Sequence, residues 1–287
     1  MLFTRNTATV NLFGTDVPEP RVFLDFLGFE SHVIQIREKR GAGIYPGWYD
    51  HAAYYVIDIP PEKLYGPGEE VTIPACVKAP DYEFEIACLA TKQALLTTME
   101  EALKYFKEHC YLTIINDWSA RDIQKKDMEG LGPTNSKFVI GKSIGPKLVK
   151  ASQLKMDENG VLDFEMTLRV NGEERSRSNY QSLYHTHPTT GAKQAWSFPR
   201  IMSWLGQQTI AIQPGYVIGS GTVGNGCIAE FSAKMDPKTG AELEPAKYGW
   251  LKDGDTINME VEGIGVLENK VRVAASDRCA KEYAAVK

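Results

Sequence analysis

Short strand-like segments separated by turn signals recur through the second half of this 287-residue chain. Residues 161–170 alternate between apolar and polar side chains, and Asn171-Gly172 follows as a hairpin signal. Residues 216–220, 228–233 and 256–261 have the composition of further strands. Because few helices interrupt the series, the sequence predicts a mixed, β-rich sandwich or β-roll with a few flanking helices, and not a doubly wound sheet.

A few segments have the pattern of helices. In residues 20–40, apolar side chains recur at spacings of three and four residues, which predicts one helix over the whole segment. Thr98 to Glu101 forms a capping box that opens a helix to about His109, and Ser197 caps a short helix that ends at Gly206. Strands of the first half are expected at 54–57, 81–90 and 111–116.

The chain has the bulk composition of a globular domain. Hydrophobic residues make up 43% and charged residues 24%, which argues against disorder. No linker divides the chain, so we expect an N-terminal lead segment over residues 1–20 and a single domain over residues 21–287.

Charge and hydropathy exclude several kinds of partner. The formal net charge is −5 and no run of Lys and Arg reaches five, so a nucleic acid is not expected as a partner. No apolar stretch approaches the roughly 18 residues of a membrane span, and Arg5 and Asn6 stand where a signal peptide has its apolar core. The odd cysteine count without a CxxC spacing predicts reduced thiols and a cytoplasmic location (Cys76, Cys88, Cys110, Cys227 and Cys279).

Two glutamates in the segment 81–87 point to a cation. Side chains alternate along a strand, so Glu83 and Glu85 share one face. Two carboxylates at this spacing repel each other unless water or a hard cation such as Mg²⁺ or Ca²⁺ lies between them. The alternative is a half-exposed strand with a polar outer face.

A second cluster follows the apolar strand that ends at Asp117. If the next residues turn helically, Asp117, Arg121 and Gln124 lie on one face at i, i+4 and i+7. A carboxylate, a guanidinium and an amide would then converge. Alternatively, Asp117 caps the helix and Arg121 pairs with it.

A histidine and an aspartate stand seven residues apart in the segment 20–40. On a continuous helix, Asp25 and His32 would lie nearly on one face, two turns apart. His32 is then a candidate general base beside a metal ligand. The alternative is a histidine packed and hydrogen-bonded in the core.

These motifs together resemble the fumarylacetoacetate hydrolase family. The resemblance rests on DYEFEIA (81–87), NDWSARDIQ (116–124), LGP (131–133) and GSGTVG (219–224), and it extends from about Asp25 to Val266. It implies the β-roll of that family's C-terminal catalytic domain, a homodimer and a small-molecule substrate.

The resemblance also implies roles for individual residues. A divalent metal, with Mg²⁺ favoured over Ca²⁺ or Mn²⁺, would be held by Asp25, Glu83, Glu85 and Asp117. His32 matches the catalytic histidine and Glu230 the glutamate that orients it. Substrate or oxyanion contacts are expected from Arg121, Gln124, Lys137, Thr222 and Tyr55. Lys142 competes with Lys137 for one of these positions by a short gap.

The expected activity is hydrolysis of a carbon–carbon bond in a 1,3-diketo acid, such as an acylpyruvate or a fumarylacetoacetate-like compound. Decarboxylation, isomerisation or dehydration of a related oxo acid is the alternative, and a non-catalytic ligand-binding β-roll is a further one. The distinguishing feature is the His32–Glu230 pair, because only hydrolysis requires the enzyme to activate water for attack.

The sequence departs from the family pattern at three places, which leaves the identity of the substrate open. A tyrosine expected near Asp127–Met128 is absent, and only Arg37 or Arg40 can stand for a substrate-binding arginine. Residues 180–194 exceed the usual connection. They contain His185-Thr-His187, which could ligate a metal, but Pro188 and Gly191 favour a surface loop that could cover the site.

Overall fold

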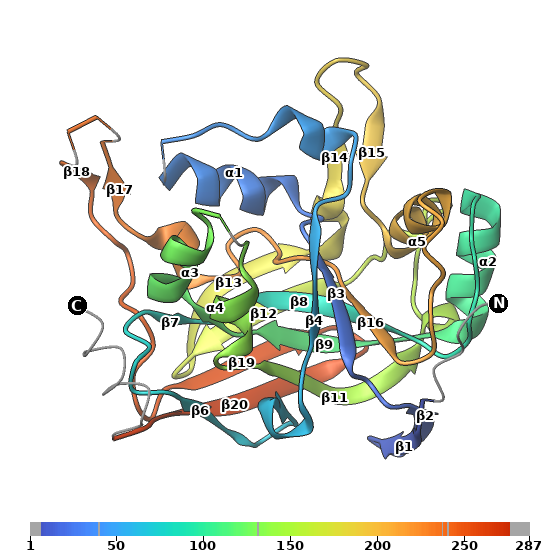
Figure 1. The fold of residues 1–287 in the computed structure, drawn as a ribbon, viewed down its shortest axis with the longest axis horizontal. Coiled ribbons are helices and arrows are strands. Elements are labelled where there is room, and N and C mark those ends of the chain that lie inside the picture. Colours follow the sequence, from blue (N-terminus) through green and yellow to red (C-terminus); the bar gives the residue numbers. More distant parts are fainter. Residues whose placement is uncertain (1–6, 40, 131, 237, 240, 276–287) are drawn as a thin grey trace.

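The computed structural model describes residues 7–39, 41–130, 132–236, 238–239 and 241–275. Two sheets form its centre (Figure 1). The seven-stranded sheet has the order β4 (Tyr54–Asp58), β3 (Val22–Phe26), β16 (Tyr216–Gly219), β8 (Phe84–Ala90), β9 (Cys110–Asp117), β11 (Lys142–Lys150) and β5 (Leu64–Tyr65). The five-stranded sheet has the order β13 (Glu173–Asn179), β12 (Glu165–Val170), β19 (Thr256–Val261), β20 (Gly265–Val273) and β6 (Glu70–Ile73).

Shorter elements flank the two sheets. The two-stranded pairs are β1 (Thr9–Leu12) with β2 (Thr15–Pro18), β7 (Pro80–Asp81) with β10 (Ser119–Ala120), β14 (Tyr184–Thr186) with β15 (Lys193–Ala195), and β17 (Lys234–Met235) with β18 (Glu242–Glu244). The α-helices are α1 (Glu30–Lys39), α2 (Met99–His109), α3 (Arg121–Asp127), α4 (Thr134–Phe138) and α5 (Phe198–Gln207). Single 3₁₀ turns are η1 (Pro46–Tyr49), η2 (Pro61–Lys63), η3 (Ala151–Gln153), η4 (Tyr180–Leu183) and η5 (Ile228–Phe231).

This arrangement confirms the β-rich fold with a few flanking helices. The capping box at Thr98 opens α2 as expected, with Glu101 N–H bonding the Thr98 hydroxyl. Asn171 and Gly172 form the predicted hairpin turn between β12 and β13, and both have positive φ angles of 52° and 80°. Within the described residues, no helix is long and apolar enough to cross a membrane.

The central strands are buried on both faces. In β8, Phe84, Ile86 and Cys88 belong to the larger apolar core, while Ala87 and Leu89 belong to a smaller core on the opposite face. The alternation of β9 is the same, with Ile114 on the larger core and Ile115 on the smaller. The face of the smaller core is the one on which the site is built, as described below.

The predicted helix over residues 20–40 is wrong. Val22–Phe26 is a strand, β3, paired with β4 and β16, and the helix begins only at Glu30. Phe23 packs into the smaller core and Leu24 into the larger, so adjacent apolar residues satisfy a strand buried on both faces. The apolar residues of a strand and of the short helix after it therefore had, taken together, the spacing expected of one continuous helix. Asp25 and His32 do not stack on one helix.

The strand expected at 228–233 is also wrong, because residues 228–231 form the 3₁₀ turn η5. The backbone N–H groups of Ile228 and Ala229 donate to the Asp81 carboxylate at 2.8 and 3.0 Å. Glu230 Oε2 accepts the Cys227 N–H at 3.0 Å. Side-chain carboxylates thus accept hydrogen bonds from backbone N–H groups that would otherwise pair with a neighbouring strand.

Residues 180–194 lie at the surface, with residues 188–193 exposed, but they form regular structure and not an open loop. They comprise η4 and most of the β14–β15 hairpin, visible above α5 in Figure 1, and both His185 and His187 are buried. The His185 ring packs 4.7 Å from the Trp48 ring, and His187 Nε2 lies 3.2 Å from Asp50 Oδ1. The two histidines therefore anchor the hairpin on the segment that carries Trp48.

Candidate active site and metal centre

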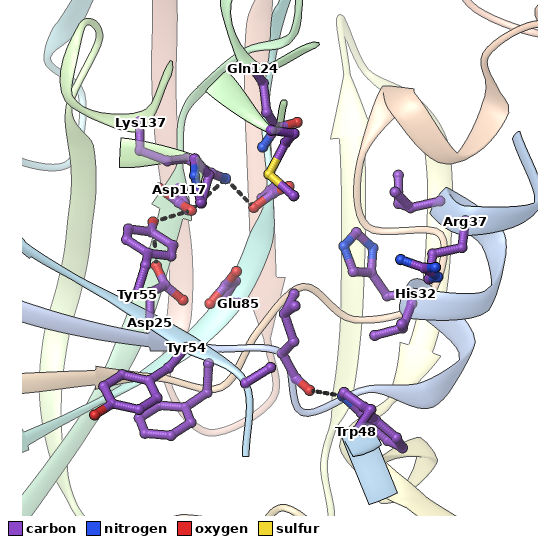
Figure 2. Close-up of a pocket in the computed structure, with 18 of the residues that line it drawn as sticks. Asp25, His32, Arg37, Trp48, Tyr54, Tyr55, Glu85, Asp117, Gln124 and Lys137 are labelled. Atoms are coloured by element: carbon purple, nitrogen blue, oxygen red, sulfur yellow. Dashed lines mark hydrogen bonds and ion pairs between the residues drawn. The ribbon is translucent and has the colours of Figure 1, made fainter. Parts of the chain in front are cut away.

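Three of the four predicted metal-binding carboxylates converge. Asp25, Glu85 and Asp117 are buried and offer oxygens that lie within 4.8 Å of one another (Figure 2). They come from three strands of one sheet, β3, β8 and β9, on the face of the smaller core. The half-exposed strand considered for Glu83 and Glu85 is wrong, because their exposed fractions are only 6% and 2%.

A glycine allows these carboxylates to approach. Gly219 lies on β16 between β3 and β8, opposite Asp25 on one side and Ala87 on the other. A Cβ at this position would lie 2.4 Å from Asp25 Oδ1 and 3.0 Å from Glu85 Oε2. The first glycine of GSGTVG therefore leaves space for the carboxylates themselves.

Glu83 lies beside this cluster and is held by cations. Its Oε1 is 2.7 Å from Arg121 Nη2, and its Oε2 is 2.5 Å from Lys137 Nζ. Although burial disfavours the charged form, Lys137 and Arg121 keep the pKa of Glu83 well below its usual range. Both oxygens of this predicted ligand are thus engaged within the protein.

The two lysines considered for one position of the site lie in different places. Lys137 lines the cavity, and its ammonium contacts Glu83, Asp117 at 2.6 Å and Ser119 at 2.7 Å, so all three hydrogens have protein partners. Lys142 is fully buried and does not line the cavity. Its Nζ lies 2.5 Å from Asp25 Oδ2 and 2.6 Å from Asp117 Oδ1, so it bridges the two carboxylates from outside the cavity.

Tyr55 and Thr222 also contact carboxylates. Tyr55 OH lies 2.7 Å from Asp117 Oδ2 and 3.1 Å from Asp25 Oδ2, and it accepts from Lys142 Nζ at 2.9 Å. Burial, then Asp117 and Asp25, raise the pKa of Tyr55 well above its usual value, so it stays a neutral donor. Thr222 donates to Glu85 Oε1 at 3.2 Å and does not line the cavity, unlike Tyr55.

The donor set fits one divalent cation. The connected buried network has five carboxylates (Asp25, Asp81, Glu83, Glu85 and Asp117) against three cations (Arg121, Lys137 and Lys142), which leaves a formal charge of −2. Among the described residues, no Lys or Arg forms an ion pair with Glu85, which accepts from Gly221 N–H and Thr222. Burial and then Asp25 and Asp117 raise the pKa of Glu85 well above its usual value. A hard cation at these oxygens would relieve that repulsion.

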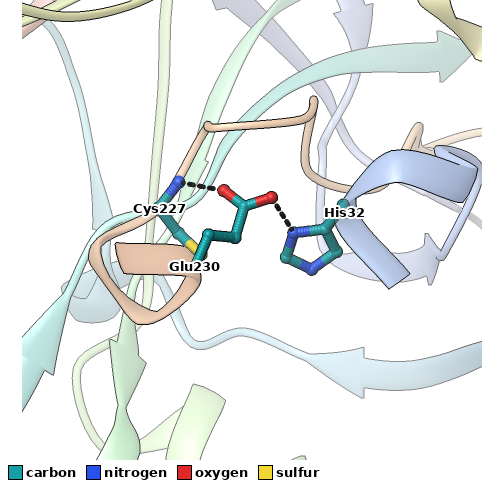
Figure 3. Close-up of side chains that lie close together, drawn as sticks. All are labelled: His32, Cys227 and Glu230. Carbon is teal, nitrogen blue, oxygen red and sulfur yellow. Dashed lines mark hydrogen bonds and ion pairs between the residues drawn. The ribbon is translucent and has the colours of Figure 1, made fainter. Parts of the chain in front are cut away.

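His32 and Glu230 form the predicted pair. His32 Nδ1 lies 3.0 Å from Glu230 Oε1, both side chains are buried, and Figure 3 shows the imidazole edge facing the carboxylate. Glu230 also accepts the backbone N–H groups of Asn225 and Cys227, at 3.1 and 3.0 Å. Because the carboxylate is fixed, His32 keeps its proton on Nδ1 and has Nε2 available as an acceptor. His32 is buried and hydrogen-bonded, as the alternative of a packed core histidine expects, and it also lines the cavity.

Arg121 and Gln124 lie together at the start of α3, but Asp117 is not on that helix. Arg121 pairs with Asp81 at 2.8 Å and with Glu83, and its Nη1 donates to Gln124 Oε1 at 2.9 Å. The alternative in which Asp117 caps the helix and pairs with Arg121 is therefore wrong, and Ala120 is the N-cap residue. Because Gln124 Oε1 accepts this hydrogen bond, the amide N–H groups of Gln124 can donate to another partner.

All the site residues expected from the sequence except Thr222 and Glu230 line one cavity of about 390 Å³. Asp81 was missed in the sequence, and Lys142 was considered there only as a competitor of Lys137. Asp81 belongs to the quoted segment DYEFEIA, yet it supports Arg121 and η5 and does not line the cavity. Arg37 lines the cavity, whereas Arg40 and Leu131 lie outside the described residues.

We expect the substitution Lys142→Met to destabilise the metal-free protein. Asp25 and Asp117 would lose a buried cation, and breaking a buried pair from one side typically costs about 3–5 kcal/mol. Urea denaturation in EDTA measures this loss, and added Mg²⁺ should recover part of it. The control is Lys147→Met, an exposed lysine on the same strand, which should change the free energy of unfolding by less than about 0.5 kcal/mol. Equal stabilities of the two variants would contradict the role given to Lys142.

The comparisons with known proteins show the family of this chain. Residues 21–272 match the model of the fumarylacetoacetate (FAA) hydrolase C-terminal domain, so the chain belongs to the fumarylacetoacetate hydrolase family. An uncharacterized protein of Pyrococcus abyssi is 28% identical over 222 residues, which are 77% of this chain and 80% of that protein. An oxaloacetate tautomerase of Bacillus subtilis is 27% identical over 198 residues, 67% of this chain and 52% of that protein.

A solved structure has the same fold. The fumarylpyruvate hydrolase from Pseudomonas aeruginosa, in complex with Mn²⁺ and pyruvate, superimposes with a TM-score of 0.64 at 19% identity. The match covers 96% of this chain and 99% of that one. The proteins that this chain resembles include hydrolases, isomerases and tautomerases.

Proposed function

We propose that this protein is a divalent-metal-dependent hydrolase that cleaves a carbon–carbon bond in a 1,3-diketo acid. The observation that carries the proposal is that His32, oriented by Glu230, lines the same cavity as the Asp25–Glu85–Asp117 cluster. A base that activates water and a cation site that withdraws electrons are the two requirements of this reaction. The Mn²⁺ and pyruvate in the structure of the fumarylpyruvate hydrolase support the same reading.

The carboxylates would hold the metal. Asp25, Glu85 and Asp117 would be the principal ligands, with Glu83 engaged through Arg121 and Lys137. When bound, the cation would polarise the substrate carbonyls and stabilise the enolate that departs, and Mg²⁺ or Mn²⁺ would suit the oxygen donors.

His32 would move the protons. Its Nε2 takes a proton from water, and the resulting hydroxide attacks the carbonyl carbon of the acyl group. The C–C bond then breaks, and its electron pair passes to the enolate of pyruvate. His32 returns its proton to the enolate carbon, so one water is consumed and a carboxylic acid and pyruvate are released. Glu230 stabilises the imidazolium between these steps.

The tetrahedral oxyanion would be stabilised by the groups opposite His32. Gln124 contributes its amide N–H groups, because Arg121 occupies the amide oxygen. Lys137 contributes its positive charge, since its hydrogens already bond Glu83, Asp117 and Ser119. Tyr55 keeps Asp25 and Asp117 in place, and Thr222 does the same for Glu85.

Tautomerisation or isomerisation of an oxo acid is the second candidate. The resemblance to the oxaloacetate tautomerase of Bacillus subtilis favours it. The same base and cation could move a proton between carbon and oxygen of an oxo acid without attack by hydroxide. Decarboxylation and dehydration would use the same carboxylates.

The products separate these reactions. We expect acetylpyruvate with Mg²⁺ to give acetate and pyruvate in equal amounts, followed by proton NMR together with the loss of enol absorbance. Release of CO₂ would indicate a decarboxylase. Exchange of the C3 protons of oxaloacetate without cleavage of acetylpyruvate would overturn the proposal in favour of a tautomerase. Binding without any turnover would indicate a ligand-binding β-roll.

A further inference from the structure

The cavity has two chemically different ends. Lys137 and Gln124 lie at the top of Figure 2 and Trp48 and Tyr54 at the bottom, with the carboxylates between them. The walls away from Lys137 are mainly apolar and include Phe26, Leu27, Val33, Ile36, Trp48 and Tyr54. The proposed reaction uses none of these side chains, so their occupant must be a further part of the substrate.

This apolar wall is preformed. The rings of Phe26 and Tyr54 stack with centroids 4.7 Å apart and planes at 14°. Trp48 is buried, and its indole N–H donates to Leu27 O at 2.7 Å, which fixes the ring and satisfies its polar atom. Because these groups are already ordered, an apolar ligand would lose little affinity to their immobilisation.

The charges oppose a second carboxylate at this end. Apart from Arg121 and Lys137, both paired with carboxylates, Arg37 is the one Lys or Arg among the described residues that lines the cavity. Arg37 is half-buried on α1, and Figure 2 shows it beside His32, across the cavity from Tyr54. A terminal carboxylate on the acyl arm would have to leave water beside Phe26 and Tyr54, which is unfavourable without a cation next to it.

We propose that this end of the cavity binds an apolar acyl arm, so that the substrate is a 2,4-dioxo acid with a longer alkyl or an aryl acyl group and a single carboxylate. This inference rests on the proposed function. The cavity volume of about 390 Å³ is within the usual range for small-molecule sites of roughly 300–1,000 Å³ and leaves space for such an arm.

A series of acylpyruvates tests the inference. From acetyl to butanoyl to hexanoyl, kcat/KM should rise by about fourfold for each methylene that becomes buried, and benzoylpyruvate should also exceed acetylpyruvate. Fumarylpyruvate should be a poorer substrate than the analogue in which an isopropyl group replaces its terminal carboxylate. Equal rates along the series, or a preference for fumarylpyruvate, would overturn the inference. A complete lack of acylpyruvate cleavage would instead contradict the proposed function.

Leu27 supplies the variant, because it lines the cavity next to Trp48, whose indole N–H bonds its backbone O, yet it is 41% exposed and can be changed without a core defect. Leu27→Ala should reduce the ratio of kcat/KM for hexanoylpyruvate to that for acetylpyruvate by about tenfold. The matched control is Leu95→Ala, a leucine that is 54% exposed and does not line the cavity, and it should keep the ratio. The same ratio in both variants would place the acyl arm elsewhere.

Discussion

Replacing His32 by alanine is expected to reduce the rate of diketo acid hydrolysis by about 10²–10⁴-fold, the usual contribution of a positioned general base. His32 is the histidine that lines the cavity with Asp25, Glu85 and Asp117, and Glu230 fixes its Nδ1 at 3.0 Å. The carboxylate cluster does not include it, so the variant should still bind Mg²⁺ with nearly normal affinity. Steady-state kinetics on acetylpyruvate and calorimetric titration with Mg²⁺ measure the two effects separately.

His109→Ala is the matched control for this prediction. His109 lies at the end of α2, away from the cavity, and its replacement should leave kcat within about twofold. Glu230→Gln adds a second comparison, since the amide oxygen can still accept from Nδ1 but no longer stabilises the imidazolium. We expect an intermediate loss and a changed pH profile of kcat. Normal hydrolysis by His32→Ala would show that another group activates the water.

Local patterns predicted much of the fold because the forces that produce them are local. The Thr98–Glu101 capping box is satisfied by atoms within four residues, and the Asn171-Gly172 turn needs positive φ angles that these two residue types tolerate. Strand β8 was expected from its alternating sequence, although burial on both faces places Glu85 inside the protein. By contrast, β3 has apolar neighbours on both faces, and spacing alone could not distinguish it from the helix that follows.

Most of the candidate site could be located because motif residues carry its chemistry. Glu83, Glu85, Asp117 and Arg121 come from two short segments, and the structure brings them together at the ends of β8 and β9. The contribution of Lys142 could not be predicted, since it depends on the register that sets Lys142 opposite Asp117 on β9. Nor could the burial of His185 and His187 be predicted, because their partners Trp48 and Asp50 are far away in the sequence.

Removal of the divalent metal is expected to abolish hydrolysis, and the carboxylate that should respond most clearly is Glu85. Burial and the neighbouring Asp25 and Asp117 raise its pKa well above the usual value, and among the described residues no ion pair joins it to a basic side chain. Glu85→Gln should therefore weaken Mg²⁺ binding by at least about 100-fold, since even outer partners of ligands contribute 10–100-fold. In EDTA, however, the variant should be as stable as the native protein or more stable.

Weaker Mg²⁺ binding together with unchanged or higher stability in EDTA distinguishes a metal ligand from a structural carboxylate. A purely structural Glu85 would lose stability in EDTA when it is changed, whereas a ligand loses metal affinity. Because a raised pKa lets protons compete with the ion, the apparent Mg²⁺ affinity of the native protein should also fall as the pH is lowered through the pKa of Glu85, and that of the variant should fall less. Glu242→Gln, on the exposed strand β18, is the control and should change neither quantity. Unaltered metal affinity in Glu85→Gln would remove the basis for a cation at this cluster, and with it the proposed stabilisation of the enolate.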